Sequence, residues 1–328
     1  MQRVKIKEES EGYYRRQPVE VFSSGCALFD CVLGGGWALG RVVNIVGDKS
    51  TGKTLLAIEA AANFVRKFPD GKIFYNEVEA AFDAVYAERM GLPLASTEFI
   101  EGCVSVEDVF EDLEKRLAEH TGRSLYILDS LDALSDRKEL EGKIDQASFG
   151  VGKAKAMSQM FRRLVQLMAD KKMTVVVISQ VRTNIGVTFG SSITRSGGRA
   201  LDFYASQIVY LSQIKQLVRT KHKVERTVGI RIRAKCKKNK VGAAFRECDM
   251  PIMFYYGIDD ITAHLEFLEE IKALDGLGYG ADAKTVWKFL LGLSDADYTA
   301  MKDFLADTVI MKWQEIEKEF TPEKAKYE

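Results

Sequence analysis

The chain has 328 residues, and 46% of them are hydrophobic, which is enough to build one large domain or two smaller ones around a sizeable core. Its 47 lysines and arginines balance its 47 aspartates and glutamates, so only local clusters of charge can argue for a polyanionic partner. No apolar run reaches the length of a membrane-spanning helix, and five widely spaced cysteines form no C-x-x-C pair. Because the charged N-terminus also lacks the apolar stretch of a signal peptide, we expect a reduced, cytoplasmic protein without a membrane partner.

Apolar strands and amphipathic helices alternate through most of the chain. Strands are predicted at residues 42–46, 72–76, 125–129 and 174–179. Helices are predicted at residues 55–61, 82–90, 104–119 and 154–169. This alternation predicts an α/β core, with a mostly parallel twisted central sheet flanked by helices on both faces.

The pattern changes beyond residue 202. Strands at 208–211 and 228–234, joined by polar turns, predict an antiparallel extension of the sheet, and the composition from residue 261 onward is helical. We therefore expect three parts, namely an N-terminal arm at 1–18, a core at 19–260 and a small helical C-terminal domain at 261–328.

A phosphate-binding loop follows the first core strand. The sequence GDKSTGKT fits the pattern G-x-x-x-x-G-K-[ST], in which glycines let backbone N–H groups converge on an anion at a helix N-terminus. Lys53 would reach the β- and γ-phosphates, and the Thr54 hydroxyl would ligate Mg²⁺. The sequence thus predicts a nucleoside triphosphate site made by Gly47, Asp48, Lys49, Ser50, Thr51, Gly52, Lys53 and Thr54.

Polar side chains at the ends of three other strands complete this predicted site. Asp129 ends an apolar strand, which we expect to lie adjacent to the phosphate-loop strand, and is the second candidate metal ligand. Glu77 and Glu79 follow the strand at 72–76, and either could accept a proton from an attacking water. Gln180 follows the strand at 174–179 and could contact the γ-phosphate.

Two basic segments are candidates for contact with a polyanion. Residues 181–199 are rich in glycine, serine, threonine and arginine, which is typical either of a flexible surface loop or of one that binds nucleic-acid phosphates and bases. Residues 215–240 carry eleven lysines and arginines and a single acid, Glu225. Alternation at Arg231, Arg233 and Lys235 points these cations to one face of a strand. That face is either solvated or directed at a polyanion or a neighbouring subunit's nucleotide.

Taken in order, these segments resemble the bacterial RecA recombinase family over residues 19–257. The likeness is carried by the phosphate loop and by five further segments, EAAFDAVYA at 79–87, LDSLDAL at 128–134, AMSQ at 156–159, QVRTNIGVTFG with GGRAL within 180–201, and KNK at 238–240. It implies ATP as the nucleotide and Mg²⁺ as its metal, held by Thr54 and Asp129.

The resemblance also implies roles for individual residues. Glu79 rather than Glu77 would activate water, Asp83 would contact the adenine edge and Tyr86 would stack on the ring. Gln180 would sense the γ-phosphate. Lys238 and Lys240 would reach the nucleotide of an adjacent subunit.

Two DNA loops are implied at about 142–152 and within 181–199. The residues implied to contact DNA there, and on the helix after the first loop, are Lys155, Arg162, Arg182, Ile185, Phe189, Arg195, Gly197, Gly198 and Arg199.

The function implied is that of a DNA-dependent ATPase. It would form a helical filament on single-stranded DNA, with ATP at the subunit interface, and pair that strand with a homologous duplex. The alternative is a nucleotide-binding regulator or scaffold with the same fold that exchanges no strands. A hexameric helicase motor is a weaker interpretation, because it does not account for the second loop.

Overall fold

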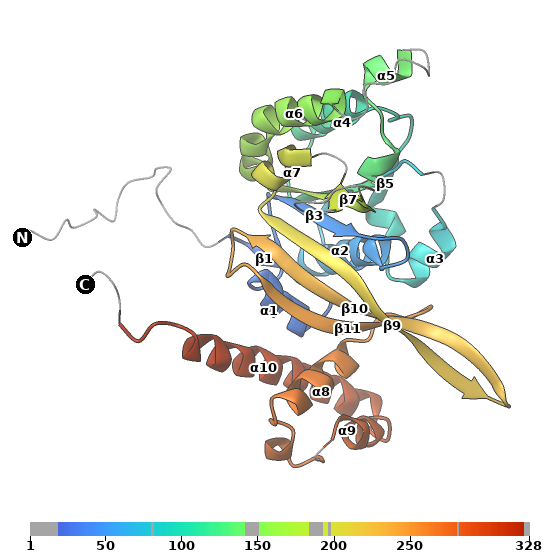
Figure 1. Ribbon diagram of the computed structural model, residues 1–328, viewed down its shortest axis with the longest axis vertical. Coiled ribbons are helices and arrows are strands. Elements are labelled where there is room, and N and C mark those ends of the chain that lie inside the picture. Colours follow the sequence, from blue (N-terminus) through green and yellow to red (C-terminus); the bar gives the residue numbers. More distant parts are fainter. Residues whose placement is uncertain are drawn as a thin grey trace, which may run out of the picture.

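The computed structural model describes residues 19–79, 82–141, 151–183, 193–195, 198–280 and 282–324, with the backbone alone at 151, 182–183, 193–195 and 198–199. Its centre is a twisted sheet whose hydrogen-bonded order is β12-β11-β10-β9-β3-β7-β6-β4-β5, with β8 paired to β7 (Figure 1). The parallel strands are β3 (Val42–Gly47), β4 (Lys72–Glu77), β5 (Thr97–Ile100), β6 (Ser124–Asp129) and β7 (Met173–Thr183).

The other side of the sheet is largely antiparallel. β9 pairs parallel with β3, and the strands beyond it then alternate in direction. These strands are β9 (Gln207–Lys221), β10 (Val224–Asn239), β11 (Arg246–Met253) and β12 (Gly257–Ile258), while β8 is Ile193–Arg195. A separate two-stranded sheet joins β1 (Val21–Phe22) to β2 (Trp37–Ala38).

Helices cover both faces of the sheet, because successive side chains of each buried strand point to opposite faces. Val42 and Val46 pack with the helices α4, α6 and α7, whereas Val43 and Ile45 pack in a second cluster with α1, α2 and the C-terminal helices (Figure 1). The bounds are α1 (Ala27–Leu33), α2 (Lys53–Lys67), α3 (Ala84–Arg89), α4 (Val106–Glu119), α5 (Arg137–Glu141), α6 (Val151–Asp170) and α7 (Gly198–Tyr204).

The C-terminal segment is helical, as predicted. It contains α8 (Asp260–Glu270), α9 (Ala283–Leu290) and α10 (Asp295–Glu319). Leu265, Leu305 and Val309 of these helices are fully buried in the same cluster as Leu56 of α2. The division into three parts at residues 18 and 260 stays a prediction. Across the ranges given above, no helix is both long and apolar enough to cross a bilayer.

The predicted α/β class and parallel core are confirmed, with the four predicted core strands shifted by few residues. The prediction was wrong about the length of β9 and β10, which form a ribbon of 15 and 16 residues that extends away from the body (Figure 1). The distal part of the ribbon is exposed on both faces, so its sequence lacks the apolar alternation that marks a half-buried strand.

Candidate functional site

The phosphate loop lies between the end of β3 and the start of α2, as its spacing predicts. Ser50 and Gly52 adopt left-handed backbone conformations, with φ of 57° and 86°. A Cβ atom on Gly47 would lie 2.5 Å from the Thr51 hydroxyl oxygen, and one on Gly52 would lie 2.5 Å from Ile252 Cδ1. Gly52 is therefore favoured by its left-handed backbone and by the approach of Ile252 from β11, and Gly47 by the approach of Thr51 within the loop.

Lys53 begins α2 and turns back over the loop. Its ammonium donates a hydrogen bond of 2.6 Å to the carbonyl oxygen of Asp48, and the side chain is only 8% exposed. Burial lowers the pKa of Lys53, and the nearby carboxylates, Asp129 first, oppose that effect. A buried ammonium at a helix N-terminus can bind the terminal phosphates of a nucleotide.

Asp129 and Thr54 form the candidate metal site. The Thr54 hydroxyl donates a hydrogen bond of 2.8 Å to Asp129 Oδ2, and the Tyr75 hydroxyl donates one of 3.2 Å to the same oxygen. Burial raises the pKa of Asp129 to about 6, although both hydrogen bonds act in the opposite direction. A hydroxyl and a carboxylate side by side beside a phosphate loop fit Mg²⁺, which prefers oxygen ligands and takes few from the protein when phosphates supply others.

One topological prediction about Asp129 was wrong. Its strand β6 is not adjacent to β3, because β7 lies between them in the sheet. Asp129 still reaches Thr54, since the hydroxyl comes from the first turn of α2, after the loop has left β3.

The two candidate glutamates occupy different positions. Glu79 Oε1 accepts hydrogen bonds from the Ser130 hydroxyl and, at 3.4 Å, from the side-chain amide of Gln180. Glu77 instead accepts a bond of 3.1 Å from the backbone N–H of Glu79. Gln180 lies opposite Gly47 in the register of β7 and β3, at the start of the phosphate loop. This geometry favours Glu79 as the carboxylate beside Gln180.

The predicted adenine residues lie at the start of α3. The Asp83 carboxylate caps this helix by accepting a hydrogen bond of 2.9 Å from the Tyr86 backbone N–H. The Tyr86 ring lies edge-on to Tyr255, with ring centroids 6.3 Å apart, and Arg89 lies over the Tyr255 ring. Sequence reasoning missed Tyr255. The signal was the aromatic run 254–256, which is exposed just after β11.

The predicted DNA contacts are only partly within the described residues. Lys155 and Arg162 are exposed on α6. The backbone positions of Arg182 and Arg195 lie in the paired strands β7 and β8, and those of Gly198 and Arg199 lie in α7. The remaining predicted positions lie outside the description, namely Ile185, Phe189, Gly197 and residues 142–150 of the first loop.

Lys238 and Lys240 lie at the end of β10. The Lys238 ammonium donates hydrogen bonds to the carbonyl oxygens of Asp202 and Phe203, at the C-terminal end of α7. Lys240 is exposed, and its backbone N–H donates to the Ser206 carbonyl. Their contact with an adjacent subunit's nucleotide stays a prediction.

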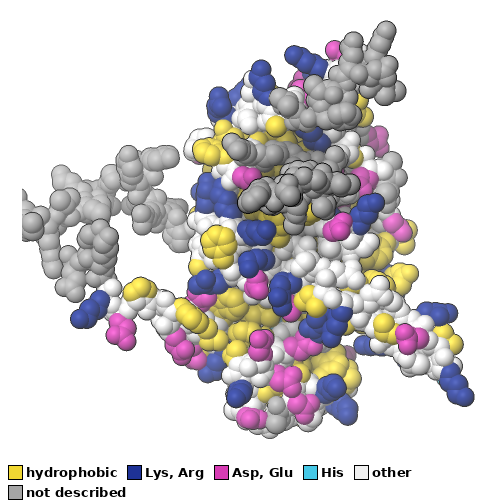
Figure 2. Space-filling view, in the orientation of Figure 1, with side chains coloured by type: hydrophobic (Ala, Val, Ile, Leu, Met, Phe, Trp, Pro, Cys, Tyr) yellow, Lys and Arg dark blue, Asp and Glu magenta, His cyan; other side chains and the backbone are white. Residues whose placement is uncertain are grey.

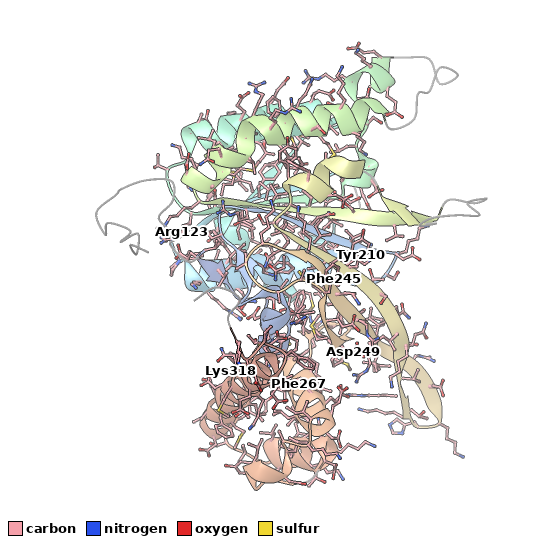
Figure 3. All side chains as sticks on the ribbon, turned by 60° about the vertical axis from the view of Figure 1, so that its left-hand side comes forward. Arg123, Tyr210, Phe245, Asp249, Phe267 and Lys318 are labelled. Carbon is pink, nitrogen blue, oxygen red and sulfur yellow. The ribbon has the colours of Figure 1, made fainter. Side chains whose placement is uncertain are left out.

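The cations at 231, 233 and 235 lie on one face of β10, and this predicted alternation is confirmed. Each has an acidic partner. The ion pairs are Arg231–Glu266 at 2.5 Å, Arg233–Asp249 at 2.7 Å and Lys235–Glu247 at 2.6 Å. Arg231 and Arg233 line a cavity of about 450 Å³ between the sheet and the C-terminal helices, which Asp249 and Phe267, labelled in Figure 3, also line. Lysine and arginine side chains also gather at the far end of the ribbon (Figure 2).

Comparisons with known proteins agree over most of the chain. The family model described as the RecA N-terminal domain matches residues 9–259. Protein RecA of Prochlorococcus marinus strain MIT 9303 is 32% identical over 286 residues, covering 83% of this chain and 72% of the relative. Protein RecA of strain MIT 9211 is 33% identical over the same length, covering 83% and 75%. Protein RecA of Parasynechococcus marenigrum strain WH8102 is 32% identical, covering 83% and 73%.

Proposed function

The chain belongs to the RecA family, and on that premise we propose that it is a DNA-dependent ATPase that acts in DNA recombination and repair. It forms a helical filament on single-stranded DNA, with Mg·ATP between subunits, and pairs the bound strand with a homologous duplex. The observation that supports this best is the convergence of Thr54 with Asp129, and of Glu79 with Gln180, beside one phosphate loop.

Each of these side chains has a task in hydrolysis. Lys53 binds the β- and γ-phosphates, and Glu79 orients the attacking water and accepts its proton. Thr54 and Asp129 hold Mg²⁺, which neutralises charge on the phosphates when bound. In the filament, Lys238 and Lys240 of the next subunit approach the same triphosphate.

Gln180 makes DNA binding depend on the nucleotide. Its side chain lies beside Glu79, and its strand β7 continues to Thr183, where the second predicted DNA segment begins. Contact with the γ-phosphate orders that segment over DNA, and hydrolysis releases it. Because the arginines on this segment contact phosphates rather than base edges, binding is largely independent of sequence.

The test is ATP-dependent binding to single-stranded DNA. Fluorescence polarisation of a labelled oligonucleotide should show tight binding with ATP at low salt, weak binding with ADP and a steep decline with added salt. Absence of ATP-dependent binding at low salt would rule the proposal out. Strand exchange between a single-stranded circle and a homologous linear duplex then tests pairing directly, with a heterologous duplex as the control.

The alternative is a nucleotide-binding regulator or scaffold with the same fold. Electron microscopy with ATP and single-stranded DNA separates the two. Regular helical filaments support the recombinase, whereas discrete rings or monomers support the alternative. Imaging with and without residues 1–18 tests whether the arm contributes to assembly.

A further inference from the structure

The segment that follows Asp129 contacts three elements that the proposed mechanism connects. It runs from Ser130 through the short 3-10 helix η2 (Leu131–Ala133) to Leu134. Its hydrogen bonds join the Ser130 hydroxyl to Glu79, the Asp132 carboxylate to the backbone N–H of Gln180, and the carbonyl oxygens of Leu131 and Leu134 to the ammonium of Lys153. One short stretch of chain therefore lies against the predicted catalytic glutamate, β7 and α6.

Asp132 replaces a missing strand partner of β7. The ladder between β6 and β7 ends at the pair Leu128 and Val177, yet β7 continues to Thr183. The backbone N–H of Gln180 therefore has no acceptor from β6, and Asp132 Oδ2 accepts it at 2.5 Å. A buried N–H without an acceptor costs free energy, so this half-buried carboxylate holds β7 in place at Gln180.

Lys153 fixes the beginning of α6 in a similar way. Its side chain is 8% exposed, and its ammonium donates hydrogen bonds of 2.5 and 2.7 Å to the carbonyl oxygens of Leu131 and Leu134. An ammonium is buried only where such acceptors compensate for lost water. The neighbouring Gly152 is packed so closely that a Cβ atom would lie 2.2 Å from Asp136 Oδ2. The first turn of α6 is therefore held directly against the segment after Asp129.

We infer that Asp132 and Lys153 are positioning residues that transmit the nucleotide state to the two predicted DNA segments, an inference that rests on the proposed function. Asp132 acts on the segment beyond Thr183 through Gln180. Lys153 acts on α6, where Lys155 and Arg162 are the predicted contacts. Asp132 lies within the segment 128–134 that carries the family resemblance, but that resemblance implies a role there only for Asp129, and Lys153 lies outside the resembling segments. The hydrogen bonds of Asp132 and Lys153 assign their role.

The experiment compares matched variants in the full chain. For Asp132 the pair is Asp132→Ala and Asp132→Asn, because asparagine removes the charge but keeps an oxygen that can accept the Gln180 N–H. The charge matters separately, since the Asp132 carboxylate is among those that oppose the lowered pKa of Lys53. For Lys153 the variant is Lys153→Met. Its control is Arg163→Met. Arg163 is an exposed cation on the same helix, α6, and it pairs with Glu114 of α4.

The readout is the ratio of the dissociation constants for single-stranded DNA in ADP and in ATP, together with the KM for ATP without DNA. Asp132→Ala and Lys153→Met should lower that ratio on the order of fivefold. Asp132→Asn should keep most of the ratio while sharing any change in KM with Asp132→Ala. Arg163→Met should leave the ratio unchanged.

Each outcome bears on a different statement. A wild-type protein without ATP-dependent DNA binding removes the proposed function itself. Wild-type coupling together with unchanged ratios in Asp132→Ala and Lys153→Met overturns this inference alone. Equal ratios in Asp132→Ala and Asp132→Asn also overturn it for Asp132, because the hydrogen bond would then be irrelevant. Should Lys153→Met not fold, as circular dichroism would show, the Asp132 pair decides.

Discussion

Lys53 and Lys238 are proposed to bind the same triphosphate from two different subunits, yet their surroundings in one chain differ. Lys53 is buried, and its ammonium contacts a carbonyl only five residues away in its own loop. Lys238 lies at a strand end, and its ammonium contacts carbonyls some 35 residues away at the end of α7. A local loop thus positions the first lysine, whereas the packing of α7 against the sheet positions the second. Substitutions of Lys53 and of Lys238 should accordingly impair ATP binding and turnover in different ways.

The largest effect is expected at Lys53, which its own loop positions. Lys53→Ala removes the cation that binds the terminal phosphates, so ATP binding and DNA-stimulated turnover should fall by on the order of 100-fold or more. A coupled phosphate-release assay and nucleotide titration measure both. Lys67→Ala, at the other end of the same helix, is the control and should retain activity. Retained turnover in Lys53→Ala would contradict the site assignment.

The next effect separates binding from hydrolysis within the same site. Glu79→Ala should keep ATP-dependent filaments on DNA but slow hydrolysis by roughly 100-fold, because the carboxylate is needed only to activate water. Electron microscopy and steady-state turnover test the two halves of this statement. Glu77→Ala should hydrolyse ATP nearly normally. A normal rate in Glu79→Ala would instead transfer the role to Glu77.

A smaller effect is expected at Lys238 and Lys240, and it should appear only when subunits assemble into a filament. Lys238→Met and Lys240→Met should lower DNA-stimulated turnover on the order of tenfold, while dilute subunits bind ATP as the wild type does. Comparing nucleotide affinity at low protein concentration with turnover on DNA makes this distinction. An equal loss of both would mean that these lysines act within their own subunit, which would remove the contrast with Lys53.

The smallest effect concerns a third ionisable side chain, Glu59, which shares α2 with Lys53. It accepts a hydrogen bond of 2.8 Å from the Ile258 N–H, and burial raises its pKa from 4.5 to about 7. The folded protein therefore favours the protonated form, and the stability associated with this group is lost as the pH rises through about 7.

The variant Glu59→Gln should remove that pH dependence. At pH 8 its free energy of unfolding should exceed that of the wild type by about 1–2 kcal/mol. At pH 5 the two proteins should be nearly equal in stability. Chemical denaturation at the two pH values is the measurement. An unchanged difference between pH 5 and pH 8 would show that Glu59 does not titrate in this range.

The sequence was sufficient where neighbours along the chain determine the structure. The phosphate loop, the strand that ends in Asp129 and the alternation of core strands and helices all follow from short-range patterns, and the structure contains them. Spacing alone left Glu77 and Glu79 open, whereas the family resemblance favoured Glu79, and in the folded chain Ser130 and Gln180 contact Glu79.

Contacts between distant segments could not be predicted in this way. No sequence pattern marked a role for Asp132 or Lys153, although Asp132 lies within the segment 128–134, since their partners are a backbone N–H and two carbonyls that any residue carries. Tyr255 approaches Tyr86 only through the fold. The ribbon of β9 and β10 is longer than predicted because backbone pairing, rather than an apolar face, extends it.

The shared cluster beneath the sheet has a consequence for synthesis of the protein. Phe22 and Leu56 near the beginning of the chain are buried together with Leu305 and Val309 near its end. At translation rates of roughly 5–20 residues per second, Val309 is added about 15–60 s after Phe22. During that interval the emerging chain exposes the apolar surface that α10 later covers. Growing cells would thus have to protect this apolar surface until α10 leaves the ribosome.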